Sequence, residues 1–415
     1  MFTGFISILT KLLEYLAGMD KMTAYKAVVK GNDTYAWRAL VSMGRPMWKS
    51  AFNALMVMHG DEMIAAASVV DLAARKLLLG RDFCSARSYA NETTMFGVAS
   101  MLCPLGLRQY SKSVLGSRVI ADFMAVLAYV NFKGDGQLSS YSSDPVLALG
   151  AWYAAGSPLS KYMIPQLRML LTGEALDTGG MSEVVARIVL LLAMDSCVVK
   201  GTKSQGHATR DFMGQFVSVR VFMDVLVGPD PPLKVNRLQT ADQNTKIAFD
   251  AWQDKWDDWQ LRFSHFVQLM CEPTEETLWV LLGRRAAGIL PRNHSGVNLV
   301  ISIFHREKCE VSVMLVQVKD LANHDPESAR DSMSPHSVFS EKNSLRMIHP
   351  CDAIRLDMGL REDEEQFVRC ESVNMISEEK EQRRRKPHPA APQQRNSDAH
   401  AQHLTTASSP GTDFT

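Results

Sequence analysis

The stretch from Gly283 to Asp320 constrains the fold of this chain more than any other part of the sequence. It contains three short apolar runs separated by turn-forming or charged residues, a pattern typical of consecutive β-strands. The predicted strands span Arg285–Leu290, Val297–Phe304 and Val311–Val318. Proline, asparagine, serine and glycine fill the first gap, and a charged loop fills the second. The stretch therefore predicts three short strands joined by turns.

Polar side chains stand at the ends of two of these strands. Asn298 lies at the head of the second strand, and Gln317 and Lys319 lie at the end of the third. Side chains in a strand alternate between its two faces, so Gln317 and Lys319 share one face. These three residues are the candidate functional site. A purely structural interpretation also fits them, in which Asn298 caps a turn, Gln317 satisfies a strand edge and Lys319 extends to solvent.

Composition limits the classes of protein that this chain can be. With 415 residues and 46% hydrophobic content, it is long enough for two or three globular domains. Lys plus Arg and Asp plus Glu are equal at 45 each, so no overall charge attracts nucleic acid. Seven scattered cysteines without a C-x-x-C pair predict reduced thiols and neither a disulfide framework nor a zinc ribbon. No run of about 18 uncharged apolar residues occurs, so no membrane span is predicted.

The first part of the chain, residues 1–228, is predicted to be mainly helical. Blocks rich in alanine, leucine and methionine alternate with glycine- and proline-containing breaks. The predicted helices include Phe2–Leu16, Ala51–Met58, Met63–Leu79, Val119–Val130 and Val184–Met194. Residues 214–227 fit either a half-buried strand or a helix, and the pattern leaves both open. Gly228-Pro-Asp-Pro-Pro232 predicts a boundary, because successive prolines break both helix and sheet.

After this boundary a helix is predicted over Thr240–Met270, since Trp252, Trp256 and Trp259 recur at helical spacing. These tryptophans are interpreted as packing residues, because neighbouring aspartates would repel phosphates. A second helix is predicted from Thr274 to Leu282, with Thr274 as N-cap and acids in its first turn. Met347–Cys370 is expected to add an edge element. Residues 376–415 are polar and aperiodic, which predicts a disordered tail.

Two phosphate-binding candidates in the helical part are weak. Arg45, in a turn before a predicted helix, could form a fork for a phosphate or carboxylate, although a surface or capping arginine is more common. The segment from Lys200 to Gly206 lacks the G-x-x-x-x-G-K-[ST] order, because Thr202 precedes the Lys-Ser pair. No ATP hydrolysis is therefore expected from this chain.

A predicted acid-bearing helix, a hairpin with a polar residue at the head of its second strand, and a third strand ending in Q-x-K together resemble the PD-(D/E)xK restriction-endonuclease-like superfamily. More narrowly, the second and third strands resemble the nuclease-type domain of Crinkler-type and transposon-associated proteins of oomycetes and fungi. The resemblance implies an α-rich region resembling the C-terminal part of an NTPase module (1–228), a small α/β nuclease-like domain (233–375) and the tail (376–415).

The resemblance also implies roles for single residues. Asn298 stands where the family has its metal-binding aspartate, Gln317 takes the Glu/Gln position and Lys319 the lysine position, while Glu276 or Glu275 loosely matches the helical acid. In this family carboxylates bind Mg²⁺, which activates water for phosphodiester cleavage. Asn298 and Gln317 are neutral, so the site is expected to be degraded, and any remaining cleavage would need Mg²⁺.

The expected function is that of a degenerate nuclease-like protein that binds DNA or a protein partner inside the cell, in the cytoplasm or nucleus. The alternative is a helical protein-interaction module with no role in nucleic-acid binding. No membrane partner and no small-molecule substrate is expected in either case.

Overall fold

The computed structural model describes residues 21–30, 33–80, 100–110, 120–130, 137–141, 143–155, 176–177, 181–202, 215–227, 254, 256–291, 294, 296–319, 332–347, 352–357 and 368–371. The chain divides into two compact units, Met1–Asn374 and Met375–Thr415, and all described residues belong to the first. The predicted N-terminal helix, the proline-rich boundary at 228–232 and the predicted disordered tail lie outside the described residues.

Helices make up most of the described residues of the first part of the chain. Its helices are α2 (Lys21–Lys30), α3 (Asp33–Met43), α4 (Pro46–His59), α5 (Glu62–Leu77), α8 (Pro145–Ala155), α10 (Met181–Thr202) and α11 (Val219–Val227). Pro46 is the first residue of α4, Gly60 ends that helix in the left-handed conformation, and Asp61 caps α5 by accepting from two backbone amides. The predicted helices over 51–58, 63–79 and 184–194 are confirmed, the second apart from its last two residues.

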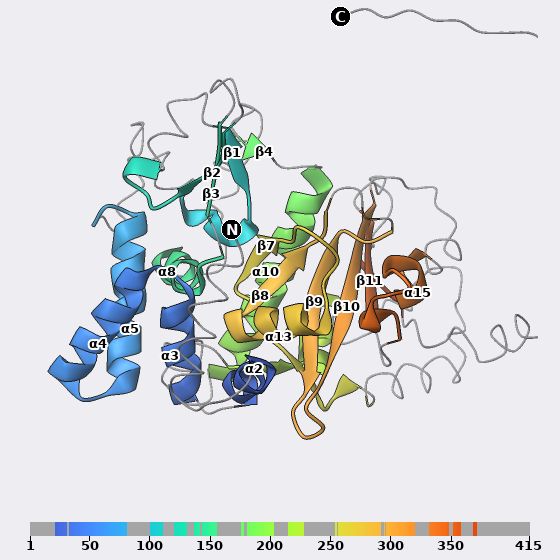
Figure 1. The fold of residues 1–415 in the computed structure, drawn as a ribbon, viewed down its shortest axis with the longest axis horizontal. Helices are drawn as coiled ribbons and strands as arrows, with labels where there is room; N and C mark the ends of the chain where they lie inside the picture. Colours follow the sequence, from blue (N-terminus) through green and yellow to red (C-terminus); the bar gives the residue numbers. More distant parts are fainter. Residues whose placement is uncertain are drawn as a thin grey trace, which may run out of the picture. The chain divides into compact units, whose positions relative to one another are not determined.

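A large mixed sheet forms the centre of the fold (Figure 1). Its strands are β5 (Val217–Ser218), β6 (Trp259–Leu261), β7 (His265–Gln268), β8 (Ala286–Ile289), β9 (Leu299–His305), β10 (Glu310–Lys319), β11 (Asp352–Asp357) and β12 (Val368–Glu371). The order is β12-β11-β10-β9-β6-β5, and β8 pairs with both β7 and β9. The three predicted strands of the Gly283–Asp320 stretch are confirmed as β8, β9 and β10, and the expected edge element as β11 and β12.

Along this stretch, β8 and β9 pair in antiparallel orientation, and so do β9 and β10. Strands β10 and β11 pair in parallel orientation. Helix α13 (Glu275–Arg284) precedes β8, and the short helices α15 (Pro335–Val338) and η3 (Ser344–Met347) lie between β10 and β11. The predicted helix over 274–282 is confirmed, with the side chain of Thr274 accepting from the backbone N of Thr277 at 3.3 Å. A parallel step needs a crossover, and α15 and η3 are the described helices that lie within it.

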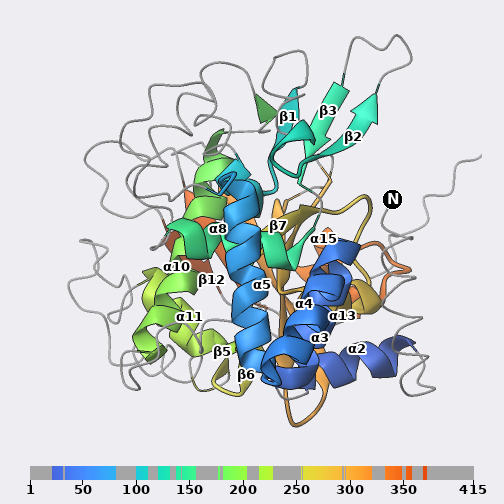
Figure 2. The same ribbon diagram turned by 90° about the vertical axis from the view of Figure 1, so that its left-hand side faces the viewer.

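Helices cover both faces of the sheet. Figures 1 and 2 show α13 and α2 on one side of β9 and β10, with α10 and α11 on the other. On the α13 side, the rings of Trp279 and Phe304 lie 6.5 Å apart. On the α10 side, Ile301 and Met314 belong to a core that also includes Leu190. This buried core is continuous from α3 to β11, and β5 pairs with β6, so described residues from both predicted regions share one sheet and one core.

Close helix packing explains one glycine in this core. Gly150 of α8 faces α5, where an added Cβ would lie 2.7 Å from the Cβ of Ala73 and 2.8 Å from the backbone N of Ala74. Only glycine allows the two helix backbones to approach this closely.

Two predictions of helix are wrong. Val126–Val130 is strand β2 of a second, four-stranded sheet, whereas the apolar run over 119–130 predicts a helix. The other strands of that sheet are β1 (Arg108–Tyr110), β3 (Gln137–Ser140) and β4 (Leu176–Asp177). A short apolar run fits a buried strand and a buried helix equally well, so periodicity could not decide.

The helix predicted over 240–270 is also wrong from Trp259 onward, where β6 and β7 occur. Trp259 pairs with His305 of β9, and β7 lies parallel to β8. Contacts with distant strands therefore outweigh the helical spacing of the tryptophans. Residues 217–227, which the pattern left open, form the two-residue strand β5 followed by α11.

The hairpin turn between β9 and β10 contains a strained residue. Cys309 has a φ of 58°, in the left-handed region that favours glycine, and its backbone N donates to the carbonyl of His305 at 2.9 Å. We expect Cys309→Gly to raise the free energy of unfolding by about 0.5–1 kcal/mol, measured by urea denaturation. Lys308→Gly, in the same turn but without a positive φ, is the control and should not stabilise the protein.

Within the described part of the chain, no helix is both long enough and apolar enough to cross a membrane.

Candidate functional site

Asn298 connects three elements at the start of β9. Its backbone N donates to the carbonyl of Val316 at 2.9 Å, and its carbonyl accepts from the backbone N of Leu290 at 2.9 Å. Its side-chain Oδ1 accepts from the backbone N of Val318 at 2.7 Å. Its Nδ2 donates to Oε1 of Glu183, on α10, at 2.9 Å. Both ends of the Asn298 amide are thus engaged, and one of them bonds to the residue between Gln317 and Lys319.

Gln317 is almost completely buried, with 1% of its surface exposed. Its Nε2 donates to the carbonyl of Gly296 at 2.5 Å and lies 3.1 Å from Oγ of Ser332. Among the described residues no group donates to its Oε1. Ser332, the next described residue after β10, packs closely against Gly296. A Cβ added at Gly296 would collide with the carbonyl oxygen of Ser332. A duplex could not reach the Gln317 side chain in this arrangement.

Lys319 ends β10 and is the charged member of the predicted set. It is half-buried, and its Cα lies opposite that of Asp357 in the parallel pairing with β11. Strand alternation places its Cβ on the same face as that of Gln317. The Asn298 and Gln317 side chains form their hydrogen bonds with residues outside this set of three, so the three side chains do not bond to one another. The strands bring the three residues to one end of the sheet without joining their side chains.

The loosely predicted acids of α13 do not complete a metal site. Glu275 is exposed, and its Oε1 accepts from Nε1 of Trp279 at 3.3 Å; Glu276 is half-buried in the same first turn. Among the described residues no group of three or more His, Cys, Asp or Glu side chains could hold a metal ion. Since Asn298 and Gln317 carry no charge, this donor set does not fit the Mg²⁺ that the resemblance implies.

Glu183 is a residue of this site that no sequence pattern could have identified. It lies in the first turn of α10 and is half-buried, 115 residues before the asparagine that it contacts. A single acid after a glycine-rich break carries no motif, so only the packing of α10 against β10 brings it to the site.

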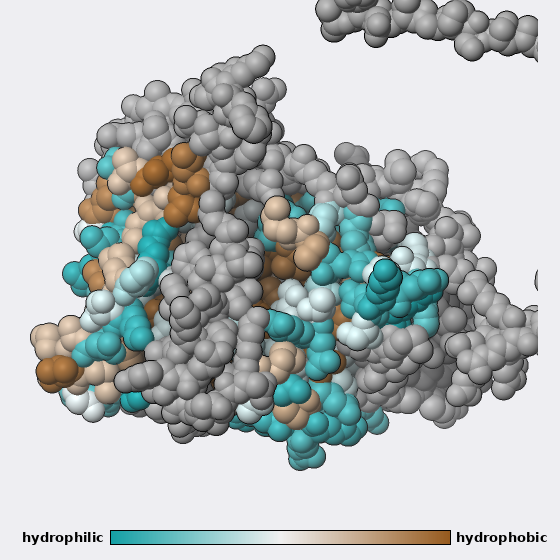
Figure 3. Space-filling model, viewed as in Figure 1, coloured by the Kyte–Doolittle hydropathy of each residue, from teal (hydrophilic) through white to brown (hydrophobic). Residues whose placement is uncertain are grey.

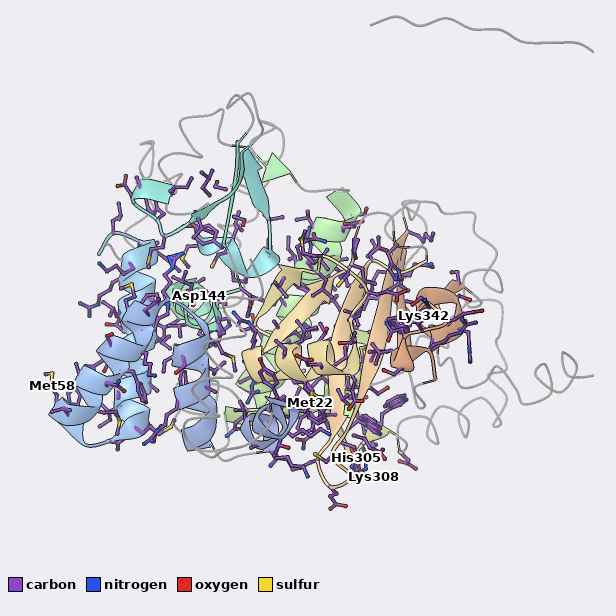
Figure 4. The ribbon with its side chains drawn as sticks, viewed as in Figure 1. Met22, Met58, Asp144, His305, Lys308 and Lys342 are labelled. Carbon is purple, nitrogen blue, oxygen red and sulfur yellow. The ribbon has the colours of Figure 1, made fainter. Side chains whose placement is uncertain are left out.

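A second polar cluster lies where the start of α8 meets β7 and the last turn of α13. Nε2 of His265 lies 2.9 Å from Oγ of Ser143, and Nε of Arg284 donates to the same oxygen at 2.8 Å. Asp144 accepts from Nε1 of Trp48 at 3.0 Å. Burial raises the pKa of the Asp144 carboxyl, although Trp48 and two arginines oppose that shift. Figure 4 labels Asp144 beside α8, at the junction of the helices with the sheet.

Arg45 belongs to this cluster. Its Nη2 donates to the carbonyl of Met124, and its Nε lies 3.7 Å from Oδ2 of Asp144. The arginine thus ties the start of α4 to the residues just before β2, and it has a carboxylate partner within the chain. Of the segment 200–206, Lys200–Thr202 ends α10, and the remaining residues lie outside the described part of the chain.

In comparisons with known proteins, no protein-family model, no curated protein and no solved structure matches this chain.

Proposed function

We propose that α13, β8, β9, β10, the α15–η3 segment and β11 form a restriction-endonuclease-like core that binds nucleic acid without cutting it. The support is the element order α-β-β-β-α-β, with an antiparallel meander followed by one parallel strand. The observation that carries the proposal is the 2.7 Å hydrogen bond from the backbone N of Val318 to Asn298, which sets Asn298 beside the Q-x-K segment.

The chemistry of the three side chains favours binding over cleavage. A Mg²⁺ site needs anionic oxygens, and here two neutral amides stand at the ligand positions. The Asn298 amide is occupied on both sides by hydrogen bonds, and Gln317 is buried. Lys319 keeps its positive charge and part of its exposure, so it can contact a phosphate without a metal. DNA is the proposed partner, and the proposed location is inside the cell, in the cytoplasm or nucleus.

Binding of a fluorescent DNA duplex at several salt concentrations tests this function. Lys319→Ala is expected to weaken binding about three- to tenfold and to reduce the slope of log affinity against log salt by about 1, because one phosphate contact is lost. Cleavage of the duplex by the unchanged protein in Mg²⁺ is expected to be absent.

Lys308→Ala is the matched control for this experiment. Lys308 is exposed in the β9–β10 turn, which Figure 4 shows at the opposite end of these strands from the site. Its removal should leave both the affinity and the salt slope unchanged. Equal losses in the two variants would indicate non-specific attraction of DNA to lysines and would count against the proposed site.

A second candidate function, a protein-interaction module, is favoured by the surface of the helical part. Val57 is 88% exposed and Met58 73% exposed at the end of α4, and Ile64 at the start of α5 is 41% exposed. Figure 3 shows apolar surface at this end of the α4–α5 hairpin, where Figure 4 labels Met58. Failure of the protein to bind any DNA in the experiment above would favour this function.

A further inference from the structure

The hydrogen bond between Glu183 and Asn298 joins the proposed core to a helix outside it. Glu183 lies on α10, which is not one of the six core elements and packs on the opposite side of the sheet from α13 (Figure 2). Its Oε1 accepts from Nδ2 of Asn298 at 2.9 Å. The same asparagine accepts from Val318 through Oδ1, so one side chain connects α10 to the end of β10.

The two bonds of the Asn298 side chain need one donor and one acceptor, which an amide supplies and a carboxylate does not. An aspartate in place of Asn298 could still accept from Val318. Its second oxygen would then face Oε1 of Glu183 at about the present 2.9 Å, and two carboxylates at that distance cannot both be ionised without a cation between them. A neutral amide on the strand is thus compatible with the acid on α10, and a second carboxylate is not.

Glu183 is itself supported by its own helix. Nε of Arg187, one turn later, donates to the backbone carbonyl of Glu183 at 3.1 Å, and its Nη1 donates to the carbonyl of Leu105 at 2.6 Å. Burial lowers the pKa of Arg187 to about 10, and the negative charge of Glu183 opposes that shift. The first turn of α10 is also where a helix dipole stabilises an acid. The negative charge of Glu183 thus has a favourable place on α10.

We propose that Glu183 and Asn298 form an exchanged pair, in which the acid of the site stands on α10 and the amide stands on the strand. Glu183 is a positioning residue: it fixes the Asn298 amide and, through Val318, the end of β10 that carries Gln317 and Lys319. Only the effect on DNA binding by Lys319 rests on the proposed function. The pair itself rests on the hydrogen bonds of Asn298 with Glu183 and Val318.

A thermodynamic cycle of variants without nucleic acid tests the pair. Asn298→Asp is expected to lower the melting temperature by about 3–6 °C at pH 8, because it sets two carboxylates against each other. Adding Glu183→Gln to that variant should recover at least half of the loss. In the double variant the amide introduced on α10 can donate to the new carboxylate, and Val318 keeps its acceptor. Millimolar Mg²⁺ or Mn²⁺ should stabilise the single variant more than the double variant.

A second comparison keeps the test valid if Asn298→Asp fails to fold. Glu183→Gln retains an acceptor for Asn298 and should melt close to the unchanged protein, whereas Glu183→Ala should melt lower. Equal melting temperatures of Glu183→Gln and Glu183→Ala, or an Asn298→Asp loss that Glu183→Gln does not relieve, would overturn the pair. These results do not depend on DNA, so failure of the Lys319 binding experiment would reject the proposed function and leave the pair standing.

Discussion

Replacing Arg284 with alanine is expected to lower the free energy of unfolding by about 3–5 kcal/mol, as measured by urea denaturation. Arg284 is 6% exposed, and its guanidinium donates to Oγ of Ser143 at 2.8 Å and to the carbonyl of Met43 at 3.0 Å, and also to the carbonyl of Ser143. It therefore joins the last turn of α13 to α3 and to the start of α8. Its loss would leave buried carbonyls without donors and would remove positive charge near Asp144.

Two controls separate this effect from a general loss of charge. Arg284→Lys keeps the charge but cannot make the same set of bonds, so an intermediate loss is expected. Arg75→Ala removes an exposed partner of Asp71, with 69% of the Arg75 side chain exposed, and should cost less than about 0.5 kcal/mol. A loss for Arg284→Ala as small as that for Arg75→Ala would show that the buried cluster does not connect the helices to the sheet.

The second large effect is a pH dependence that arises from Asp195 on α10. Burial raises the pKa of its carboxyl to about 7, although the charge of Arg262 and a hydrogen bond from Trp152 oppose the shift. In the unfolded chain this pKa is about 4, so the stability that Asp195 contributes is fully present below pH 4 and is lost as pH rises through about 7. The free energy of unfolding, relative to that of Asp195→Asn, should fall by roughly 3–4 kcal/mol from about pH 4 to about pH 8.

The comparison with Asp195→Asn is needed because His265 acts in the opposite direction. Burial, and then the charge of Arg284, lower the pKa of His265 to about 3. Its unfolded pKa is about 6.5, so its contribution to stability is lost as pH falls below that value. Subtracting the variant from the unchanged protein removes the His265 contribution from the profile. A difference between the unchanged protein and Asp195→Asn that stays flat from about pH 4 to about pH 8 would contradict the prediction.

Local patterns were sufficient where a few neighbouring residues decide the conformation. The strands β8, β9 and β10, the Thr274 cap of α13 and the proline at the start of α4 all follow from residues close together in the chain. Local patterns were not sufficient where a partner distant in the sequence decides the conformation. Residues 126–130 and 259–268 include strands that form because other strands pair with them, and no local period records that pairing.

The candidate site divides in the same way. Strand period and turn residues are local properties, so the sequence alone was enough to place Asn298, Gln317 and Lys319 at the ends of neighbouring strands. The bonding partners of these side chains, in contrast, depend on the tertiary fold. Glu183 reaches Asn298 from a helix 115 residues earlier, since α10 packs on β10 to bury its apolar face, and that packing depends on the whole core.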